Sequence, residues 1–317
     1  MISSNKIVVT DGGTINPGDL SWDELKDFGE LTVYDKSTPE QYLDRVKDAN
    51  IILTNKAVLY NELLNKLPNL EYVGVTATGY NVIDLEIANA KGITVTNVPG
   101  YGTNSVAQHV FAMILEFTNN VGNTSDKVGY GRWTEVGEWC YWDAPLFELA
   151  DKTLGIVGLG AIGNKVAKIG SAFGMHICYF TPAPKEVEYE YADLETILEK
   201  SDYITLHCPL NDETNGLIDS ERLGLMKKSA VLINTGRGQL VNEQHLAEAL
   251  KNGTIAGAAL DVLSQEPPEK NPLIGQPNCI ITPHQAWATK EARQRLLNIS
   301  IDNVRAYLNG KSQNVVN

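Results

Sequence analysis

An arginine, a glutamate and a histidine in the second half of the chain are the residues best suited to catalysis. Arg237 lies between two glycines in residues 234–238, just after an apolar run, and its planar guanidinium suits a carboxylate. Glu266 precedes two prolines, and His284 follows it 18 residues later. A carboxylate beside an imidazole fixes its tautomer and stabilises its protonated form. Together they could bind an acid and exchange a proton with it, although each alone also fits a surface cation, a solvated acid or a packing residue.

A glycine-rich turn, Gly158-Leu-Gly-Ala-Ile-Gly163, is the second chemical feature. An apolar run over 153–157 precedes it, and apolar residues at helical spacing continue to Ala172. Glycines at such a strand-to-helix junction let backbone N–H groups and the helix N-terminus approach a pyrophosphate. The turn therefore predicts a dinucleotide site, and the alternative is an ordinary turn of an α/β domain.

Strand-like apolar runs alternate with helical patterns along the chain, which is typical of parallel α/β sheets. The first series of runs covers residues 6–10, 31–34, 51–54, 72–75 and 94–95, with helices expected near 39–48, 60–66 and 83–90. The second series covers residues 153–157, 177–180, 203–207, 230–234, 256–260 and 279–282. The sequence thus predicts an α/β protein with two doubly wound parallel-sheet domains.

The domain boundaries follow from a linker and two helices. Residues 97–102 are rich in proline and glycine, and a long helix over 104–119 is expected to begin the second domain. An amphipathic helix over 288–308 is expected to return to the first domain. We therefore predict a discontinuous domain of residues 1–101 plus 287–317 and a second domain of residues 102–286.

Composition narrows the classes of partner. A chain of 317 residues that is 43% hydrophobic and 21% charged has room for two cores. Its net charge of -13 disfavours nucleic-acid binding, which requires basic residues. No signal peptide or membrane-spanning run is evident, so we expect a cytoplasmic protein that binds no membrane. The four cysteines are widely spaced, which predicts buried, reduced thiols and no metal site or disulfide framework.

Taken together, these motifs resemble the D-isomer-specific 2-hydroxyacid dehydrogenases over nearly the whole chain. The matching segments are the turn at 158–163, Leu-His-Cys-Pro-Leu at 206–210, Asn-Thr-Gly-Arg-Gly at 234–238, Glu-Pro-Pro at 266–268 and Pro-His-Gln-Ala at 283–286. Residues 76–84 resemble the family's substrate loop, and residues 104–108 resemble its interdomain helix. The resemblance implies a Rossmann NAD(P)-binding domain over 102–286 and a flavodoxin-like substrate domain in the remainder.

The implied reaction is hydride transfer between a nicotinamide cofactor and C2 of a small 2-keto or 2-hydroxy acid. His284 would be the general acid or base, Arg237 would bind the carboxylate and polarise the carbonyl, and Glu266 would hold the imidazolium. Substrate contacts are expected at Ala77, Thr78, Gly79, Arg237 and His284. Cofactor contacts are expected at Thr78, Gly158, Gly160, Ala161, Ile162, Gly163, Thr181, Cys208, Pro209, Thr235, Arg237, Asp261 and His284.

The choice of cofactor depends on the end of the second strand of the dinucleotide domain. NAD-preferring members of the family have an aspartate there that accepts from the ribose hydroxyls, whereas this chain has Thr181. No arginine follows to bind a 2′-phosphate, and Lys185 lies beyond two prolines. We therefore expect NAD, with NADP left open.

Softer signals concern substrate and assembly. Residues 100–105 and the aromatic run 139–142 resemble glycerate dehydrogenase members, which favours hydroxypyruvate or glyoxylate. Val75 stands where phosphoglycerate dehydrogenases have an arginine, so a phosphorylated substrate is not expected. The alternatives are a broad reductase for larger 2-keto acids and a non-catalytic dinucleotide-sensing protein. The aromatic run fits a core or an interface, and we expect a homodimer.

Overall fold

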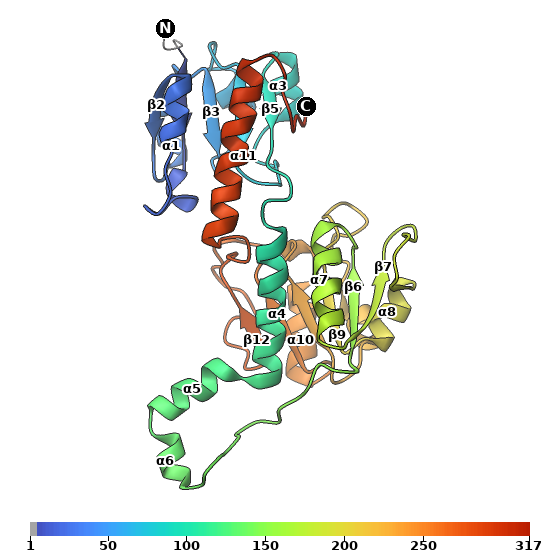
Figure 1. Cartoon of the computed structure of the whole chain (residues 1–317). Coiled ribbons are helices and arrows are strands. Elements are labelled where there is room, and N and C mark those ends of the chain that lie inside the picture. Colours follow the sequence, from blue (N-terminus) through green and yellow to red (C-terminus); the bar gives the residue numbers. More distant parts are fainter. Residues whose placement is uncertain (1–4) are drawn as a thin grey trace. The chain divides into compact units, whose positions relative to one another are not determined.

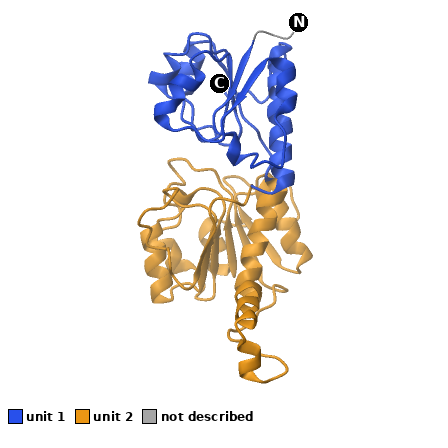
Figure 2. Ribbon diagram, turned by 90° about the vertical axis from the view of Figure 1, so that its left-hand side faces the viewer, with its two compact units in different colours: residues 1–102, 288–317 blue, residues 103–287 orange. Residues whose placement is uncertain are grey.

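The computed structural model describes residues 5–317, and the chain divides into two compact units (Figure 2). Unit 1 comprises Met1–Gly102 and Ala288–Asn317, and unit 2 comprises Thr103–Trp287. Both breaks fall one residue after the predicted boundaries of 101 and 286. The assignment of unit 1 to the substrate and of unit 2 to the dinucleotide stays a prediction.

Unit 1 contains a five-stranded parallel sheet with the strand order β2-β1-β3-β4-β5. Its strands are β1 (Lys6–Val9), β2 (Glu30–Val33), β3 (Ile51–Thr54), β4 (Tyr72–Val75) and β5 (Thr94–Thr96). Its α-helices are α1 (Pro39–Val46), α2 (Asn61–Leu64), α3 (Leu85–Ala90) and α11 (Lys290–Leu308). Every residue of β3 and β4 is buried, as expected for strands covered on both faces. The predicted return of the C-terminal helix is confirmed, because α11 packs against β4.

Unit 2 contains a seven-stranded parallel sheet with the order β12-β11-β10-β9-β6-β7-β8. Its strands are β6 (Thr153–Val157), β7 (His176–Phe180), β8 (Glu190–Tyr191), β9 (Tyr203–Leu206), β10 (Val231–Asn234), β11 (Gly257–Leu260) and β12 (Cys279–Ile281). From β6 the chain adds β7 and β8 on one side of the sheet. It then crosses back and adds β9, β10, β11 and β12 on the other side of β6. Such a reversal opens a crevice at the carboxyl ends of the strands, which is where doubly wound sheets bind ligands.

Helices cover both faces of this sheet (Figure 1). They are α4 (Thr103–Asn119), α7 (Ala161–Ala172), α8 (Leu194–Lys200), α9 (Ser220–Leu225) and α10 (Glu243–Asn252). Alternate residues of β6 pack on opposite layers, since Leu154 and Ile156 join the core under α4 and α7, whereas Val157 joins the core under α8 to α10. The predicted Rossmann-type α/β fold is thus confirmed.

Two helices of unit 2 were not predicted. α5 (Val121–Gly129) and α6 (Arg132–Val136) contain no buried residue and lead away from the lower end of α4 in Figure 1. The chain returns through residues 137–149 to β6, and we call residues 120–149 the arm. Trp139 is 86% exposed and Trp142 67% exposed, so these two tryptophans do not enter the core of their own chain. No helix within residues 5–317 combines the length and apolar character needed to cross a membrane.

The expectation of buried thiols is only partly correct. All four cysteines are free, but only Cys178 is buried, and Cys140, Cys208 and Cys279 are half-buried. Cys140 lies in the exposed arm, whereas Cys279 begins the edge strand β12. Burial nevertheless raises the pKa of the Cys279 thiol to about 12, so this residue stays a neutral thiol at physiological pH.

Candidate active site

The turn between β6 and α7 requires glycine at two positions for steric reasons. Gly158 has a left-handed backbone (φ 98°), and a Cβ on it would lie 2.5 Å from the backbone nitrogen of Cys208. A Cβ on Gly163 would lie 2.2 Å from the carbonyl oxygen of Gly158. These two glycines therefore let β6, α7 and the loop after β9 approach one another closely.

Gly160 differs, because the protein itself does not require glycine there. Its φ is -77°, and a Cβ on it would meet no atom within 4 Å. This open space lies at the N-terminus of α7, whose first N–H groups have no intrahelical acceptor and suit an anion. Across the sheet, Thr235 Oγ1 is buried without a hydrogen-bond partner in the described part of the chain. A cradle that a Cβ would fill and an orphaned hydroxyl both fit a bound dinucleotide.

The loop after β7 holds Thr181 and Lys185 in a tight arch. Thr181 is buried, and its hydroxyl donates to the carbonyl oxygen of Ala183 at 2.6 Å. The ammonium of Lys185 folds back onto the glycine-rich turn, where Nζ donates to the carbonyl oxygen of Leu159 at 2.7 Å. The sequence pattern left Lys185 beyond the prolines and gave no sign of this contact.

The loop after β9 carries His207, Cys208 and Pro209. Nε2 of His207 lies 2.9 Å from the hydroxyl of Thr205, and burial lowers the pKa of this histidine to about 4. Burial also raises the pKa of the Cys208 thiol. Both side chains are therefore neutral near pH 7, which suits residues that line a cofactor rather than exchange protons.

Arg237 lies in the loop after β10, which packs tightly against the loop after β11. The Asn234 side chain donates to the carbonyl oxygen of Arg237 at 2.8 Å and accepts from the N–H of Gly236 at 3.0 Å. A Cβ on Gly238 would lie 1.9 Å from the carbonyl carbon of Leu263, so glycine is required there. The guanidinium is exposed, and Nη1 donates to the carbonyl oxygen of Gly236. Its remaining N–H groups can bind an anion.

The structure brings Glu266 and His284 together. Oε2 of Glu266 lies 2.6 Å from Nδ1 of His284, and the two side chains are 33% and 30% exposed. Oε1 of Glu266 accepts from the N–H of Leu263 at 3.0 Å. Because Nδ1 is hydrogen-bonded to the carboxylate, Nε2 is the ring nitrogen that can exchange a proton with a substrate.

Asp261 supports the loop that carries His284. Its carboxylate is 1% exposed and accepts from the Thr282 hydroxyl at 2.6 Å and from the N–H groups of Gln285 and Ala286 at 2.9 Å each. Nε2 of His109, on α4, lies 3.0 Å from the same hydroxyl and 3.5 Å from Asp261 Oδ1. The sequence did not identify His109 as part of this network, because only the fold brings α4 beside the loop.

The predicted substrate loop lies in unit 1, just after β4. The carbonyl oxygen of Ala77 accepts from the N–H of Val98 at 2.9 Å, and that of Thr78 accepts from the Asn97 side chain at 2.8 Å. The hydroxyl of Thr78 donates back to Val98 at 2.9 Å. Within residues 5–317, the N–H groups of Ala77, Thr78 and Gly79 donate to no acceptor, so three successive donors are available for an anion.

Comparison with known proteins identifies relatives of this arrangement. The family model for the NAD-binding domain of D-isomer-specific 2-hydroxyacid dehydrogenases matches residues 111–286. A hydroxypyruvate reductase of Blautia hydrogenotrophica is 45% identical over 98% of this chain and 99% of that protein. A glycerate dehydrogenase of Methylorubrum extorquens is 44% identical over 88% of this chain and 89% of that protein.

The fold is also shared with solved structures. The NADPH-dependent glyoxylate/hydroxypyruvate reductase of Sinorhizobium meliloti, in complex with NADP and malonate, superposes with a TM-score of 0.83 at 30% identity. The match covers 99% of this chain and 97% of that one. The match therefore extends over both units, beyond the residues 111–286 that the family model covers.

Proposed function

Because the chain belongs to the D-isomer-specific 2-hydroxyacid dehydrogenases, and is thus an NAD(P)-dependent oxidoreductase, we propose that it reduces hydroxypyruvate, with glyoxylate as a second substrate. The observation that carries this proposal is the Glu266–His284 pair, in which carboxylate and imidazole are 2.6 Å apart. Such a pair supplies the proton that reduction of a ketone requires. The printed names of the two relatives described above support hydroxypyruvate as the substrate.

His284 would transfer the proton at the carbonyl oxygen. When bound, the reduced nicotinamide supplies a hydride to C2 of the keto acid. His284 would donate a proton from Nε2 to the carbonyl oxygen, and Glu266 would stabilise the imidazolium from Nδ1. The bond from the Leu263 N–H fixes the carboxylate while it does so. In the oxidative direction, the same nitrogen would accept the proton.

Arg237 and the loop after β4 would hold the substrate carboxylate. The guanidinium of Arg237 would polarise the carbonyl group and offset charge that develops on its oxygen. The N–H groups of Ala77, Thr78 and Gly79 have no other acceptor within the described residues, which supports their assignment to the carboxylate. Residue 75 is a buried valine, so no cation is available there for a phosphorylated substrate.

The cofactor proposal is NAD, held by the residues predicted from the sequence. Gly160, Ala161 and Ile162 would meet the pyrophosphate at the N-terminus of α7. Thr235 Oγ1, orphaned in the interior, supports a contact with the nicotinamide end. The remaining proposed contacts are Thr78, Gly158, Gly163, Thr181, Cys208, Pro209, Arg237, Asp261 and His284. Asp261 also holds the His284 loop through its three acceptor bonds.

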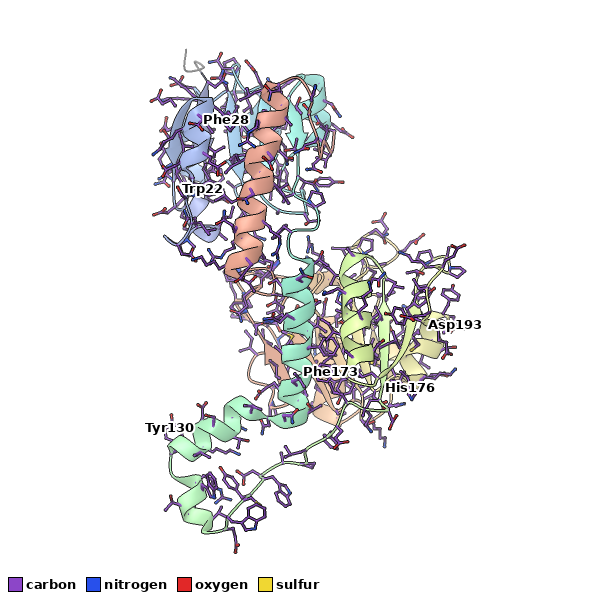
Figure 3. The ribbon with its side chains drawn as sticks, in the orientation of Figure 1. Trp22, Phe28, Tyr130, Phe173, His176 and Asp193 are labelled. Carbon is purple, nitrogen blue, oxygen red and sulfur yellow. The ribbon has the colours of Figure 1, made fainter. Side chains whose placement is uncertain are left out.

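We further propose a homodimer, in which the arm of each chain contacts the other copy. Tyr130, between α5 and α6, is 91% exposed and marks the far part of the arm in Figure 3. Trp139 and Trp142 follow it and are also largely exposed. Aromatic side chains gathered on one exposed segment are typical of protein interfaces. A cytoplasmic location stays a prediction.

The test is a steady-state assay of reduced-nicotinamide oxidation with hydroxypyruvate, glyoxylate, pyruvate and 2-ketoisocaproate, each with NADH and NADPH. We expect kcat/KM for hydroxypyruvate to exceed that for pyruvate by roughly tenfold or more, because the site would pair the extra hydroxyl. A preference for 2-ketoisocaproate would replace the proposal with a broad reductase. Dinucleotide binding without turnover of any keto acid would replace it with a dinucleotide-sensing protein.

A further inference from the structure

The loop between β11 and β12 carries Glu266 but has few apolar anchors. Over residues 263–273, the buried side chains are Leu263 and Leu273 at the two ends, which are 6% and 0% exposed. Every residue between them is exposed or half-buried. A segment with few buried contacts opens locally at little cost in free energy. Polar bonds must therefore hold this backbone if Glu266 is to keep its place.

The carboxylate of Glu243 accepts three such bonds. Oε1 accepts from the N–H of Ser264 at 2.6 Å, and Oε2 accepts from the hydroxyl of the same residue at 2.6 Å. Oε2 also accepts from the side chain of Asn271 at 2.8 Å. The two bonded residues stand on either side of Glu266 in the sequence, so the carboxylate closes the loop around it. We call Glu243, Ser264 and Asn271 the clamp.

Glu243 is held in turn by α10, of which it is the first residue. The side chain of Asn242 caps this helix by accepting from the N–H of His245 at 3.1 Å. A carboxylate in the first turn is also favoured by the helix dipole. Within residues 5–317, the hydrogen bonds of the Glu243 carboxylate all go to the loop after β11. The clamp therefore attaches an exposed loop to a fixed helix end.

The same helix end adjoins the loop that carries Arg237. Arg237 lies six residues before Glu243, and between them the side chain of Gln239 donates to the carbonyl oxygen of Ser264 at 3.2 Å. The segment from Arg237 to Glu243 thus contacts the loop of Glu266 at more than one point. Movement of one loop would disturb the other.

We propose that Glu243 is a positioning residue, which keeps the Glu266 carboxylate beside the His284 imidazole by closing the clamp. This inference rests on the proposed roles of Glu266 and His284 and adds a residue that acts through them. The bond from the Leu263 N–H to Glu266 joins two residues of one loop, so it cannot fix that loop to the rest of the domain. The clamp does so, because Glu243 belongs to α10.

The first experiment observes His284 by NMR without any substrate. Its ring carries an isotope label at Cε1, and its resonance is assigned by its absence in His284→Ala. Glu243→Ala should move the resonance towards its position in Glu266→Gln, because the imidazole loses its carboxylate neighbour in both variants. Glu243→Gln should stay near the wild type, since its amide can accept from the Ser264 N–H and donate to the Ser264 hydroxyl.

The matched control is Glu248→Ala. It removes a carboxylate from an exposed position of α10, where Glu248 accepts from Gln244 at 2.9 Å, and it should not move the His284 resonance. An unmoved resonance in folded Glu243→Ala would overturn the proposal. If thermal melting shows that Glu243→Ala is unfolded, Ser264→Ala replaces it and should give a smaller movement in the same direction.

A kinetic cycle separates positioning from general stability. We expect kcat for hydroxypyruvate to fall roughly tenfold in Glu243→Ala, but less than about twofold when the change is made in Glu266→Gln, because the clamp then holds no carboxylate. KM should change little, since neither residue is a proposed substrate contact. Equal losses in both backgrounds would overturn the proposal.

The two experiments keep this inference distinct from the proposed function. If no keto acid is turned over, the substrate-free spectra still decide whether Glu243 positions the pair. Identical spectra for the wild type and Glu266→Gln would contradict the Glu266–His284 pair itself, and the inference with it.

Discussion

His284 combines a precise side-chain contact with an uncommon backbone. Its φ of 52° lies in the left-handed region, and its N–H donates to the carbonyl oxygens of Asp261 at 2.8 Å and Thr282 at 3.0 Å. Such a conformation costs a non-glycine residue on the order of 1 kcal/mol and persists only where neighbours over-determine it. The Asp261 carboxylate supplies that support through its bonds to Gln285 and Ala286. These hydrogen bonds therefore maintain an unfavourable backbone conformation that directs the imidazole toward Glu266.

The first prediction concerns this pair. His284→Ala should lower kcat for hydroxypyruvate by on the order of 10²-fold or more, because it removes the proton donor. Glu266→Gln should lower kcat by a smaller factor, since the amide can keep the Leu263 bond but cannot stabilise an imidazolium. Glu266→Gln should bind NADH with a Kd close to that of the wild type, because Glu266 is not among the proposed cofactor contacts. Wild-type kcat in His284→Ala would contradict the assignment of the proton donor.

The second prediction concerns pH and His207, whose pKa is lowered by desolvation. Its pKa is about 4 in the folded chain and about 6.5 when unfolded, so only the neutral form is compatible with burial. The associated stability is fully present above pH 6.5 and is lost as the pH falls towards 4. That loss in unfolding free energy is on the order of 3 kcal/mol. Urea unfolding at several pH values in this window measures it.

Carboxylates titrate in the same window, so the control is His207→Gln, which cannot be protonated. The decrease in its unfolding free energy from pH 6.5 to 4 should be smaller than in the wild type by the histidine's share. Parallel pH profiles for the two proteins would mean that burial of His207 does not couple to folding.

Among single residues, the sequence identified the candidate catalytic side chains that directly follow recognisable strands. Arg237 and Glu266 each follow a buried strand, and His284 follows the half-buried edge strand β12. The fold places Glu266 beside His284. His109 and Lys185 could not be found this way. His109 meets Thr282 across 173 positions of sequence, and Lys185 reaches Leu159 only because the arch reverses the side chain.

The turn between β6 and α7 permits a test that separates folding from binding. Gly160→Ala should leave the unfolding free energy within about 0.5 kcal/mol of the wild type, because the new Cβ meets open space. The same Cβ would occupy the proposed pyrophosphate position, so the Kd for NADH should rise by roughly tenfold. Chemical denaturation and calorimetric titration measure the two effects.

Gly163→Ala is the matched control for this third prediction. Its Cβ would lie 2.2 Å from the Gly158 carbonyl oxygen, so α7 must move away from β6. Overpacking of this kind costs about 1–3 kcal/mol of unfolding free energy. If Gly160→Ala were instead the more destabilising of the two, the open cradle would be wrong.

Helices and strands could be predicted where their buried residues give a run or a periodic pattern of apolar residues in the sequence. Every predicted strand exists. The central strands, such as β3 and β4, are covered on both faces and are therefore runs of apolar residues. β8 was missed, since two exposed residues, Glu190 and Tyr191, carry no periodicity. α5 and α6 were missed for a related reason, because neither buries a residue in its own chain.

The exposed side chains of the arm support the proposed homodimer. Its exposed large side chains include Val121, Tyr130, Trp133, Trp139, Trp142, Leu146 and Phe147. Elsewhere in unit 2, an open hollow of about 550 Å³ lies between α4 and α7 and is lined by Phe111, Leu115, Ile169 and Phe173, among others. Figure 3 places Phe173 at the C-terminal end of α7, where it is 41% exposed. Both surfaces present apolar side chains, and Asn104, Gln108 and Lys165 also line the hollow.

The fourth prediction is that the wild type forms a dimer with twice the 34.7 kDa mass of the chain, as measured by size exclusion with light scattering. Trp139→Ser combined with Trp142→Ser should weaken dimerisation by about 10²-fold or more, because buried tryptophans dominate interface energies. Tyr60→Ser, 53% exposed in unit 1, is the matched control and should stay dimeric. Since both tryptophans lie outside the core, the double variant should keep its melting temperature at concentrations where the wild type is dissociated. A wild type that is monomeric at every concentration would mean that the arm serves another partner.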